Sequence, residues 1–234
     1  MNKFVVPTPE FSLKLPVSGK VVRYRPFLVK EEKLLLMLKE SKDNTMVLNN
    51  LNKIMQLCIL DDTKVCDFSY ADFEFLFLNM RVRSIGETID LETECQSCGK
   101  KTPCVVDLNA VTEEMENTTV PDSTIMLTDN IGVIIKPLEL KNAAAISNLP
   151  ENDQLKIIAA FIDKVFTESD VSSFDELSKE DQSAFIDSLS MRHISTIMEK
   201  VQQFPRLKTE VNYTCTHCQH EGKIEIEGLD NFFI

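Results

Sequence analysis

The sequence predicts an α+β fold built from two similar units, each with a β-hairpin, a helical cluster and a second hairpin carrying a CxxC motif. The same order of strand-like alternation, helix-like apolar spacing and CxxC appears in both halves. Landmarks also keep similar offsets between the halves: 111 residues from Pro26 to Pro137, 121 from Phe73 to Ile194, and 120 from Cys95 to Cys215. We therefore expect units at residues 1–112 and 123–234, joined by a polar segment at 113–122.

In the first unit, residues 11–26 are predicted to form a hairpin because apolar positions alternate on both sides of Ser18 and Gly19. Residues 30–40, rich in Glu, Lys and Leu, are predicted to form a helix. Two more helices follow, because apolar residues recur at helical spacing at Val47, Leu51, Ile54, Met55 and Cys58, and then at Phe73, Leu76, Phe77 and Met80. Strands near 88–93 and 105–106 are predicted to enclose the first CxxC motif.

The second unit repeats this order. A hairpin is predicted at 125–135, with its turn at Asp129 and Asn130. Helices are predicted near 142–148, then over 155–166, at 178–189 with Ser178 as the N-cap, and at 194–201. About ten additional residues are expected near 167–178. Strands at 207–213 and 223–226 are predicted to enclose the second CxxC motif.

The four cysteines of the two motifs, Cys95, Cys98, Cys215 and Cys218, are the predicted ligands of one structural zinc ion. Each pair lies at the tip of a strand–turn–strand, which is the knuckle geometry of zinc ribbons. One knuckle supplies two of the four ligands that a tetrahedral ion needs, so two knuckles form one site. Four thiolates leave no open position for a substrate, which favours a structural ion over a catalytic one.

Other interpretations of the cysteines stay open. An iron–sulfur cluster also takes four cysteines, and His217 or His220 could replace a thiolate ligand. A redox-active CxxC is disfavoured because strands flank both motifs, whereas redox motifs begin a helix. Cys104 could be a spare ligand, although it and the remaining cysteines, Cys58 and Cys66, are most simply small apolar residues.

Composition limits the function classes. The net charge of −12 argues against a nucleic-acid partner, since phosphate binding depends on Lys and Arg. No apolar stretch approaches the length of a membrane span, and the N-terminal residues lack a secretory signal, so we expect a reducing, intracellular environment. None of the common nucleotide-binding, hydrolase or metalloprotease motifs occurs, and neither CxxC has the sequence context of a zinc deaminase, so no enzyme is expected.

The chain ends in Phe232, Phe233 and Ile234, which either fold back onto the core or bind a groove of a partner protein.

An ordered set of short segments resembles a known family. Arg25, Pro26 and Phe27 precede a KEEKLL run at 30–35, RSIGE at 83–87 precedes the first CxxC, and FPRL at 204–207 precedes the second. This set is similar to the baseplate hub subunits and hub-assembly proteins of T4-like contractile-tailed phages. The likeness covers nearly the whole chain but does not separate the hub-subunit branch from the assembly-factor branch.

The resemblance implies a non-enzymatic structural or assembly protein that contacts other baseplate hub or tail proteins. It implies a location in the host cytoplasm during assembly or in the virion. The oligomeric state stays unassigned. From the cysteine motifs alone, the competing hypothesis is a cytosolic zinc-ribbon adaptor or transcription accessory protein.

Overall fold

The computed structural model describes residues 6–41, 43–147 and 154–232. In chain order, its first half contains β1 (Phe11–Lys14), β2 (Val21–Tyr24), α1 (Val29–Lys39), α2 (Asn44–Gln56), the 3-10 helix η1 (Val65–Asp67), α3 (Tyr70–Ser84), β3 (Thr88–Glu94), β4 (Lys101–Asp107) and α4 (Leu108–Asn117). The second half contains β5 (Thr124–Met126), β6 (Ile131–Ile135), α5 (Leu140–Ser147), α6 (Gln154–Ala159), β7 (Ile162–Thr167), β8 (Val171–Ser173), η2 (Phe174–Glu176), α7 (Lys179–Asp187), α8 (Met191–Val201), β9 (Lys208–Thr214), β10 (Glu221–Glu227) and η3 (Leu229–Phe232). The chain is thus a mixed α and β protein with small antiparallel sheets.

Buried apolar side chains of the described residues form two clusters. The larger cluster draws on residues 15–140 and again on 207–232, and we call this part of the molecule the first body. The smaller cluster lies within residues 125–204, between the β5–β8 sheet and helices α6, α7 and α8, and we call it the second body. The chain therefore leaves the first body to form β5 and β6 of the second, and returns to the first body with α5, which contacts α2. It then builds the rest of the second body and returns once more to complete the first.

Helix α3 forms the centre of the first body, since most of its residues are buried. Ser69 caps its N-terminus by accepting a hydrogen bond from the Asp72 N–H. The Asp72 carboxylate in turn accepts hydrogen bonds from the backbone N–H groups of Val17 (2.8 Å) and Ser18 (3.0 Å) in the β1–β2 turn. One side chain thus fixes the first hairpin against the central helix.

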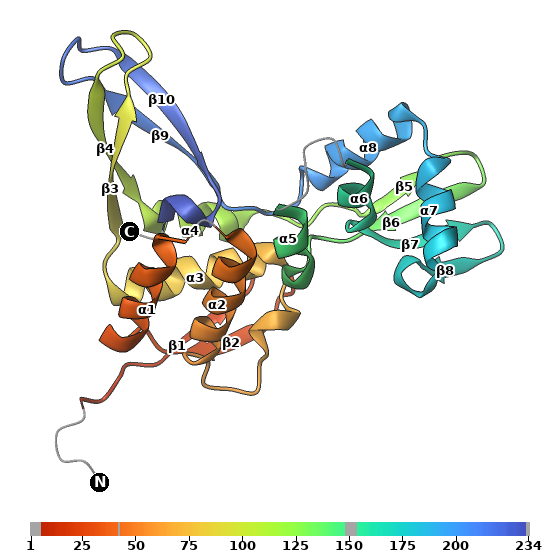
Figure 1. Cartoon of the computed structure of the whole chain (residues 1–234), viewed down its shortest axis with the longest axis horizontal. Helices are drawn as coiled ribbons and strands as arrows, with labels where there is room; N and C mark the ends of the chain where they lie inside the picture. Colours follow the sequence, from red (N-terminus) through yellow and green to blue (C-terminus); the bar gives the residue numbers. More distant parts are fainter. Residues whose placement is uncertain (1–5, 42, 148–153, 233–234) are drawn as a thin grey trace.

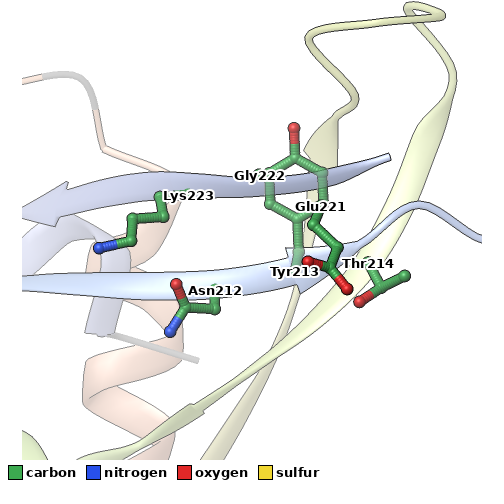
Figure 2. A pocket seen from close by; sticks show the side chains of 6 residues that line it. All are labelled: Asn212, Tyr213, Thr214, Glu221, Gly222 and Lys223. Atoms are coloured by element: carbon green, nitrogen blue, oxygen red, sulfur yellow. The ribbon is translucent and has the colours of Figure 1, made fainter. Parts of the chain in front are cut away.

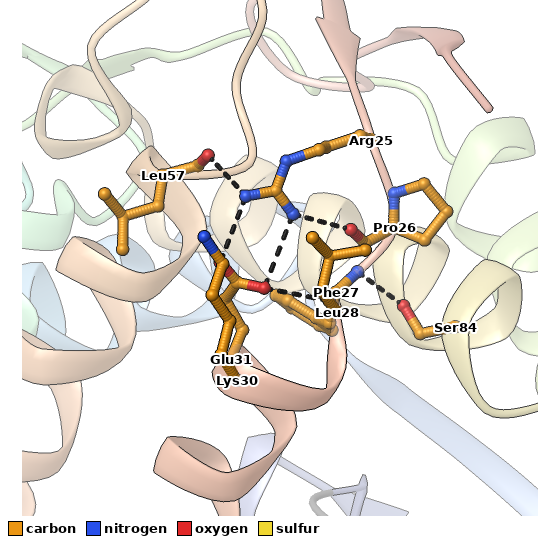
Figure 3. Close-up of polar contacts among 8 residues, drawn as sticks. All are labelled: Arg25, Pro26, Phe27, Leu28, Lys30, Glu31, Leu57 and Ser84. Atoms are coloured by element: carbon orange, nitrogen blue, oxygen red, sulfur yellow. Dashed lines mark hydrogen bonds and ion pairs between the residues drawn. The ribbon is translucent and has the colours of Figure 1, made fainter. Parts of the chain in front are cut away.

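The start of helix α1 is held by a buried ion pair (Figure 3). Glu31 is 1% exposed, accepts a hydrogen bond from the Leu28 N–H, and pairs with the Arg25 guanidinium at 3.0 Å. Arg25 also donates to the Leu57 carbonyl, at the C-terminal end of α2. The rotation of α1 about its own axis is therefore set by polar contacts as well as by packing.

The prediction of a single helix over residues 155–166 is wrong for the second half of that range. Helix α6 ends at Ala159, and Ile162 and Phe166 lie on strand β7, which pairs with β6 and β8. Their spacing fits a helix face, but a β-branched and an aromatic side chain also suit a strand, and here the hydrogen bonds to β6 decide. The additional residues expected near 167–178 form the end of this pairing, β8 and η2.

Each half of the chain has a backbone pairing between the end of its first hairpin and a residue just after its second helix. Tyr24, at the end of β2, makes an antiparallel bridge with Ile59 just after α2. Ile135, at the end of β6, pairs with Ile162 just after α6. In each half, the chain leaves a hairpin, forms two helices, and returns to the hairpin's second strand. The other predicted hairpins and helices appear within a few residues of their expected positions, and α4 occupies part of the segment expected to be a polar joint.

Candidate metal centre

Two antiparallel hairpins, β3–β4 and β9–β10, carry the CxxC motifs and project together from the first body (Figure 1). Alternate residues of each strand face inward, so that Cys104 and Val106 of β4 and Val211 and Tyr213 of β9 are buried. Strands β4 and β9 are in contact. The apolar inner faces hold the hairpins side by side and bring the two turns to the same end of the pair.

The two turns have the same backbone geometry. In the first, the Cys95 N–H donates to the Lys100 carbonyl at 3.0 Å and the Gly99 N–H donates to the Cys95 carbonyl at 2.8 Å. In the second, Cys215, His220 and Gln219 make the equivalent bonds at 2.8 and 3.0 Å. The residue after each CxxC adopts a positive φ, 70° at Gly99 and 58° at Gln219. Glycine accepts this conformation without strain, and the second turn adopts it with a larger residue.

The structure brings the four predicted sulfur atoms together. Cys95 Sγ lies 3.7 Å from Cys218 Sγ, Cys98 Sγ lies 3.7 Å from Cys215 Sγ, and all four lie within 4.8 Å of one another. Four thiolates about 2.3 Å from a central zinc ion would be about 3.8 Å apart at the corners of a tetrahedron. A disulfide needs about 2.05 Å. The spacing therefore fits a tetrahedral ion and does not fit a disulfide.

The site favours the ionised form of Cys215. The buried Thr102 hydroxyl lies 3.3 Å from Cys215 Sγ, and the His217 N–H donates to the same sulfur at 3.4 Å. The hydrogen bond from Thr102 lowers the pKa of the Cys215 thiol. Thr102 is a site residue that sequence reasoning missed. Its only sequence signal is an inward position on β4, and the sulfur that it contacts is 113 residues away.

A second contact joins the hairpins beside the sulfurs. The Tyr213 hydroxyl accepts a hydrogen bond from the Gln96 N–H at 3.2 Å, within the first CxxC turn. The Tyr213 ring lies beside Gly222 of β10, where these residues border a surface hollow (Figure 2). A Cβ atom at Gly222 would lie 2.6 Å from the Tyr213 ring, so glycine leaves the space that the ring needs.

The remaining candidate ligands lie outside the cluster. Among the described residues, the group that could hold an ion contains only the four cysteines, and neither His217 nor His220 belongs to it. Cys104 is buried in β4, and burial raises the pKa of its thiol. Cys58 is also buried, whereas Cys66 is exposed.

Near the end of the chain, Phe232 is fully buried in the first body. For this residue, the position agrees with the alternative in which the C-terminal residues fold back onto the core. Phe233 and Ile234 lie outside the described residues. Within the described part of the chain, no helix combines the length and apolar character needed to cross a bilayer.

The model of the family described as T4 bacteriophage base plate protein matches residues 7–234. The chain belongs to this family. No curated protein and no solved structure matches the chain. As a baseplate protein it is a structural component associated with the phage tail, and the competing adaptor hypothesis receives no support from the match.

Proposed function

We propose that this baseplate protein is a non-enzymatic factor of baseplate hub assembly that acts through protein–protein contacts. The observation that carries the proposal is the family match over residues 7–234. The resemblance of the ordered segments to hub subunits and hub-assembly proteins supports the more specific role. The net charge of −12 favours proteins over nucleic acid as partners.

We further propose that Cys95, Cys98, Cys215 and Cys218 hold one structural zinc ion. Zinc prefers tetrahedral sites and accepts four thiolates, and the sulfur distances of 3.7 Å suit that arrangement. Cys95 and Cys215 are buried while Cys98 and Cys218 are exposed, so the ion would lie at the surface end of the two hairpins. When bound, it would cross-link two turns that are separated by more than 110 residues of chain. Its contribution would be rigidity of the projecting hairpins.

The same site supports a two-unit organisation, with units at 1–112 and 123–234 joined through 113–122. The two CxxC turns share their hydrogen bonds and their positive φ, and the Tyr24–Ile59 bridge has its counterpart in the Ile135–Ile162 pair. In this proposal each unit contributes one zinc-ribbon-type knuckle. The second unit's knuckle hairpin returns to the first body to complete the site.

The assembly role is tested by recovering an affinity-tagged chain from infected host cells and identifying the co-purified proteins by mass spectrometry. We expect baseplate hub or tail proteins in the complex formed in the host cytoplasm. Mass spectrometry of mature virions then separates the two branches, because a hub subunit remains in the particle and an assembly factor does not. Absence of baseplate proteins from the complex, together with absence of the chain from virions, would contradict the proposal.

A matched pair of variants connects this role to the metal site. Cys95→Ser removes one proposed ligand, and Cys66→Ser removes an exposed cysteine outside the cluster. We expect the first variant to lose recovery of baseplate partners and the second to retain it. Equal recovery of baseplate partners with both variants would show that the assembly role does not depend on the zinc site.

A further inference from the structure

Helix α1 is apolar on two opposite sides. Leu35 and Leu38 point into the first body and are buried. On the other side Val29 is 67% exposed, Leu36 62% and Met37 71%. Exposed apolar side chains that gather on one side of a helix often mark a surface that another molecule covers. The outer side of α1 is therefore a candidate contact surface.

The exposure is a fixed property of the fold. Glu31, on the inner side, is held by Arg25 and by the Leu28 N–H (Figure 3). The helix also packs against α2. Rotating α1 to bury Leu36 and Met37 would break the ion pair of the Glu31 carboxylate. The side of α1 that carries Leu36 and Met37 therefore faces outward.

The exposed side has a symmetric pattern. One stripe of the helix holds residues at i, i+4, i+7, i+8 and i+11, namely Val29, Lys33, Leu36, Met37 and Glu40. Glu40 is the C-cap residue of α1 and keeps helical backbone angles. Leu36 and Met37 form the middle of this stripe. A basic residue, Lys33, lies on the N-terminal side of that middle, and an acidic residue, Glu40, lies at the same separation on the C-terminal side.

The stripe on one copy of α1 is complementary to the same stripe on a second, antiparallel copy. In an antiparallel pair of α1 helices with its two-fold axis between Leu36 and Met37, Leu36 faces Met37 of the second copy. Lys33 then faces Glu40 of the second copy, and by symmetry this ion pair occurs twice. We propose that the outer side of α1 is the surface through which two copies of this chain pair, in this antiparallel register.

The local charge supports a second copy as the occupant. Two chains of net charge −12 repel each other, and the cost is lowest where the contacting segments are neutral. Residues 28–40 contain three Lys and three Glu, so the contacting segment carries no net charge. An 11-residue helix is about 16 Å long. Such a face is smaller than a standard interface of roughly 1,600 Å², so we expect a reversible dimer with a dissociation constant in the micromolar range.

The test is sedimentation equilibrium of the full chain, purified with its metal, between about 1 and 200 μM. We expect a monomer–dimer equilibrium for the natural sequence. Leu36→Lys should abolish the dimer, while Met191→Lys, which changes an equally exposed methionine on α8, should leave it unchanged. Both positions are exposed, and circular dichroism checks that each variant is folded.

Charge reversal tests the register. Lys33→Glu alone and Glu40→Lys alone should each weaken the dimer at least about tenfold, because like charges then face each other twice. The double variant should restore the natural affinity, because it recreates both ion pairs with their signs exchanged. A chain that stays monomeric at about 200 μM would overturn the proposal. It would also be overturned if Leu36→Lys left the dimer affinity unchanged, or if the double variant did not regain the natural affinity.

Discussion

Cys95 Sγ lies 3.7 Å from Cys218 Sγ, although 123 residues separate the two cysteines in the chain. Between them the chain builds α4, the whole second body, and the return strand β9. A cross-link across so long a loop removes much of the conformational freedom of the unfolded chain. A metal ion at this position would therefore stabilise the fold as a whole and would fix how the two CxxC hairpins lie against each other.

The four cysteines should behave as one energetic unit. We expect Cys95→Ser and Cys215→Ser to lower the midpoint of urea unfolding by similar amounts, and the double variant to add little. Loss of one ligand already removes most of the site's contribution, which is on the order of 10 kcal/mol in small zinc peptides. Cys66→Ser serves as the control and should unfold like the natural chain. Additive effects of the two substitutions would indicate two separate sites.

The buried carboxyl of Glu74 should make stability depend on pH. Burial raises the pKa of Glu74 from 4.5 to about 8, although its Oε2 accepts a hydrogen bond from the Leu207 N–H. The folded state therefore keeps this proton between about pH 4.5 and 8 while the unfolded chain loses it, so stability falls as pH rises through that window.

Replacing Glu74 with glutamine isolates this contribution. Glu74→Gln keeps an acceptor for the Leu207 N–H but carries no charge. We expect it to raise the free energy of unfolding by a few kcal/mol at pH 8 and to change it little at pH 5. Glu221→Gln, at an exposed position on β10, is the control. A variant that is equally or less stable at pH 8 would show that Glu74 is ionised and well solvated in the folded protein.

The buried ion pair at the start of α1 should be sensitive to the loss of either member. Burial tends to raise the pKa of Glu31, but the hydrogen bond from Arg25 overcomes this and lowers it below the usual value. Glu31→Ala leaves the Arg25 guanidinium poorly exposed and without its carboxylate, which should cost about 3 kcal/mol at pH 7. Urea unfolding measures the cost.

The pH dependence of this cost has a defined sign. Because the pKa of Glu31 is lower in the folded state, its contribution is present above its unfolded pKa and disappears as pH falls through the folded value. The difference in the free energy of unfolding between Glu31→Ala and the natural chain should therefore become smaller at acidic pH. The neighbouring Glu32→Ala is the matched control and should change stability by no more than about 0.5 kcal/mol. A cost for Glu31→Ala as small as the control's would contradict the assignment.

Gly222 should be needed for the contact between the hairpins. A Cβ atom there would lie 2.6 Å from the Tyr213 ring, so Gly222→Ala must displace a ring whose hydroxyl accepts the Gln96 N–H. We expect a loss of about 1–3 kcal/mol in thermal or urea unfolding. Lys223→Ala, at the next and exposed position, should have little effect. If the two variants were equally stable, the ring would be free to move without cost.

Local patterns predicted most of this structure. The CxxC hairpins follow from alternation on both sides of a short turn, and Gly99 at the first turn indicates the positive φ found there. Ser178 caps α7 as expected, by accepting the Asp181 N–H. The offsets between the halves were enough to expect the four sulfurs in one site, because each knuckle alone would leave an ion with half its ligands.

What the sequence did not predict depends on contacts between distant residues. Ile162 and Phe166 continue a helical spacing, but their strand is defined by hydrogen bonds to β6, about 30 residues earlier. Helix α4 had a local signal, since Val111 and Met115 are four residues apart and both are buried, but the charged residues around them favoured a polar joint. Thr102 became a site residue only when the two hairpins were brought together.

Native mass spectrometry of the chain, purified under reducing conditions without a chelator, measures the metal content most directly. We expect one zinc ion per chain. Replacing any one of the four cysteines with serine should abolish zinc binding, and Cys66→Ser should retain it. A chain that carries no metal, or one that carries iron in place of zinc, would contradict this expectation.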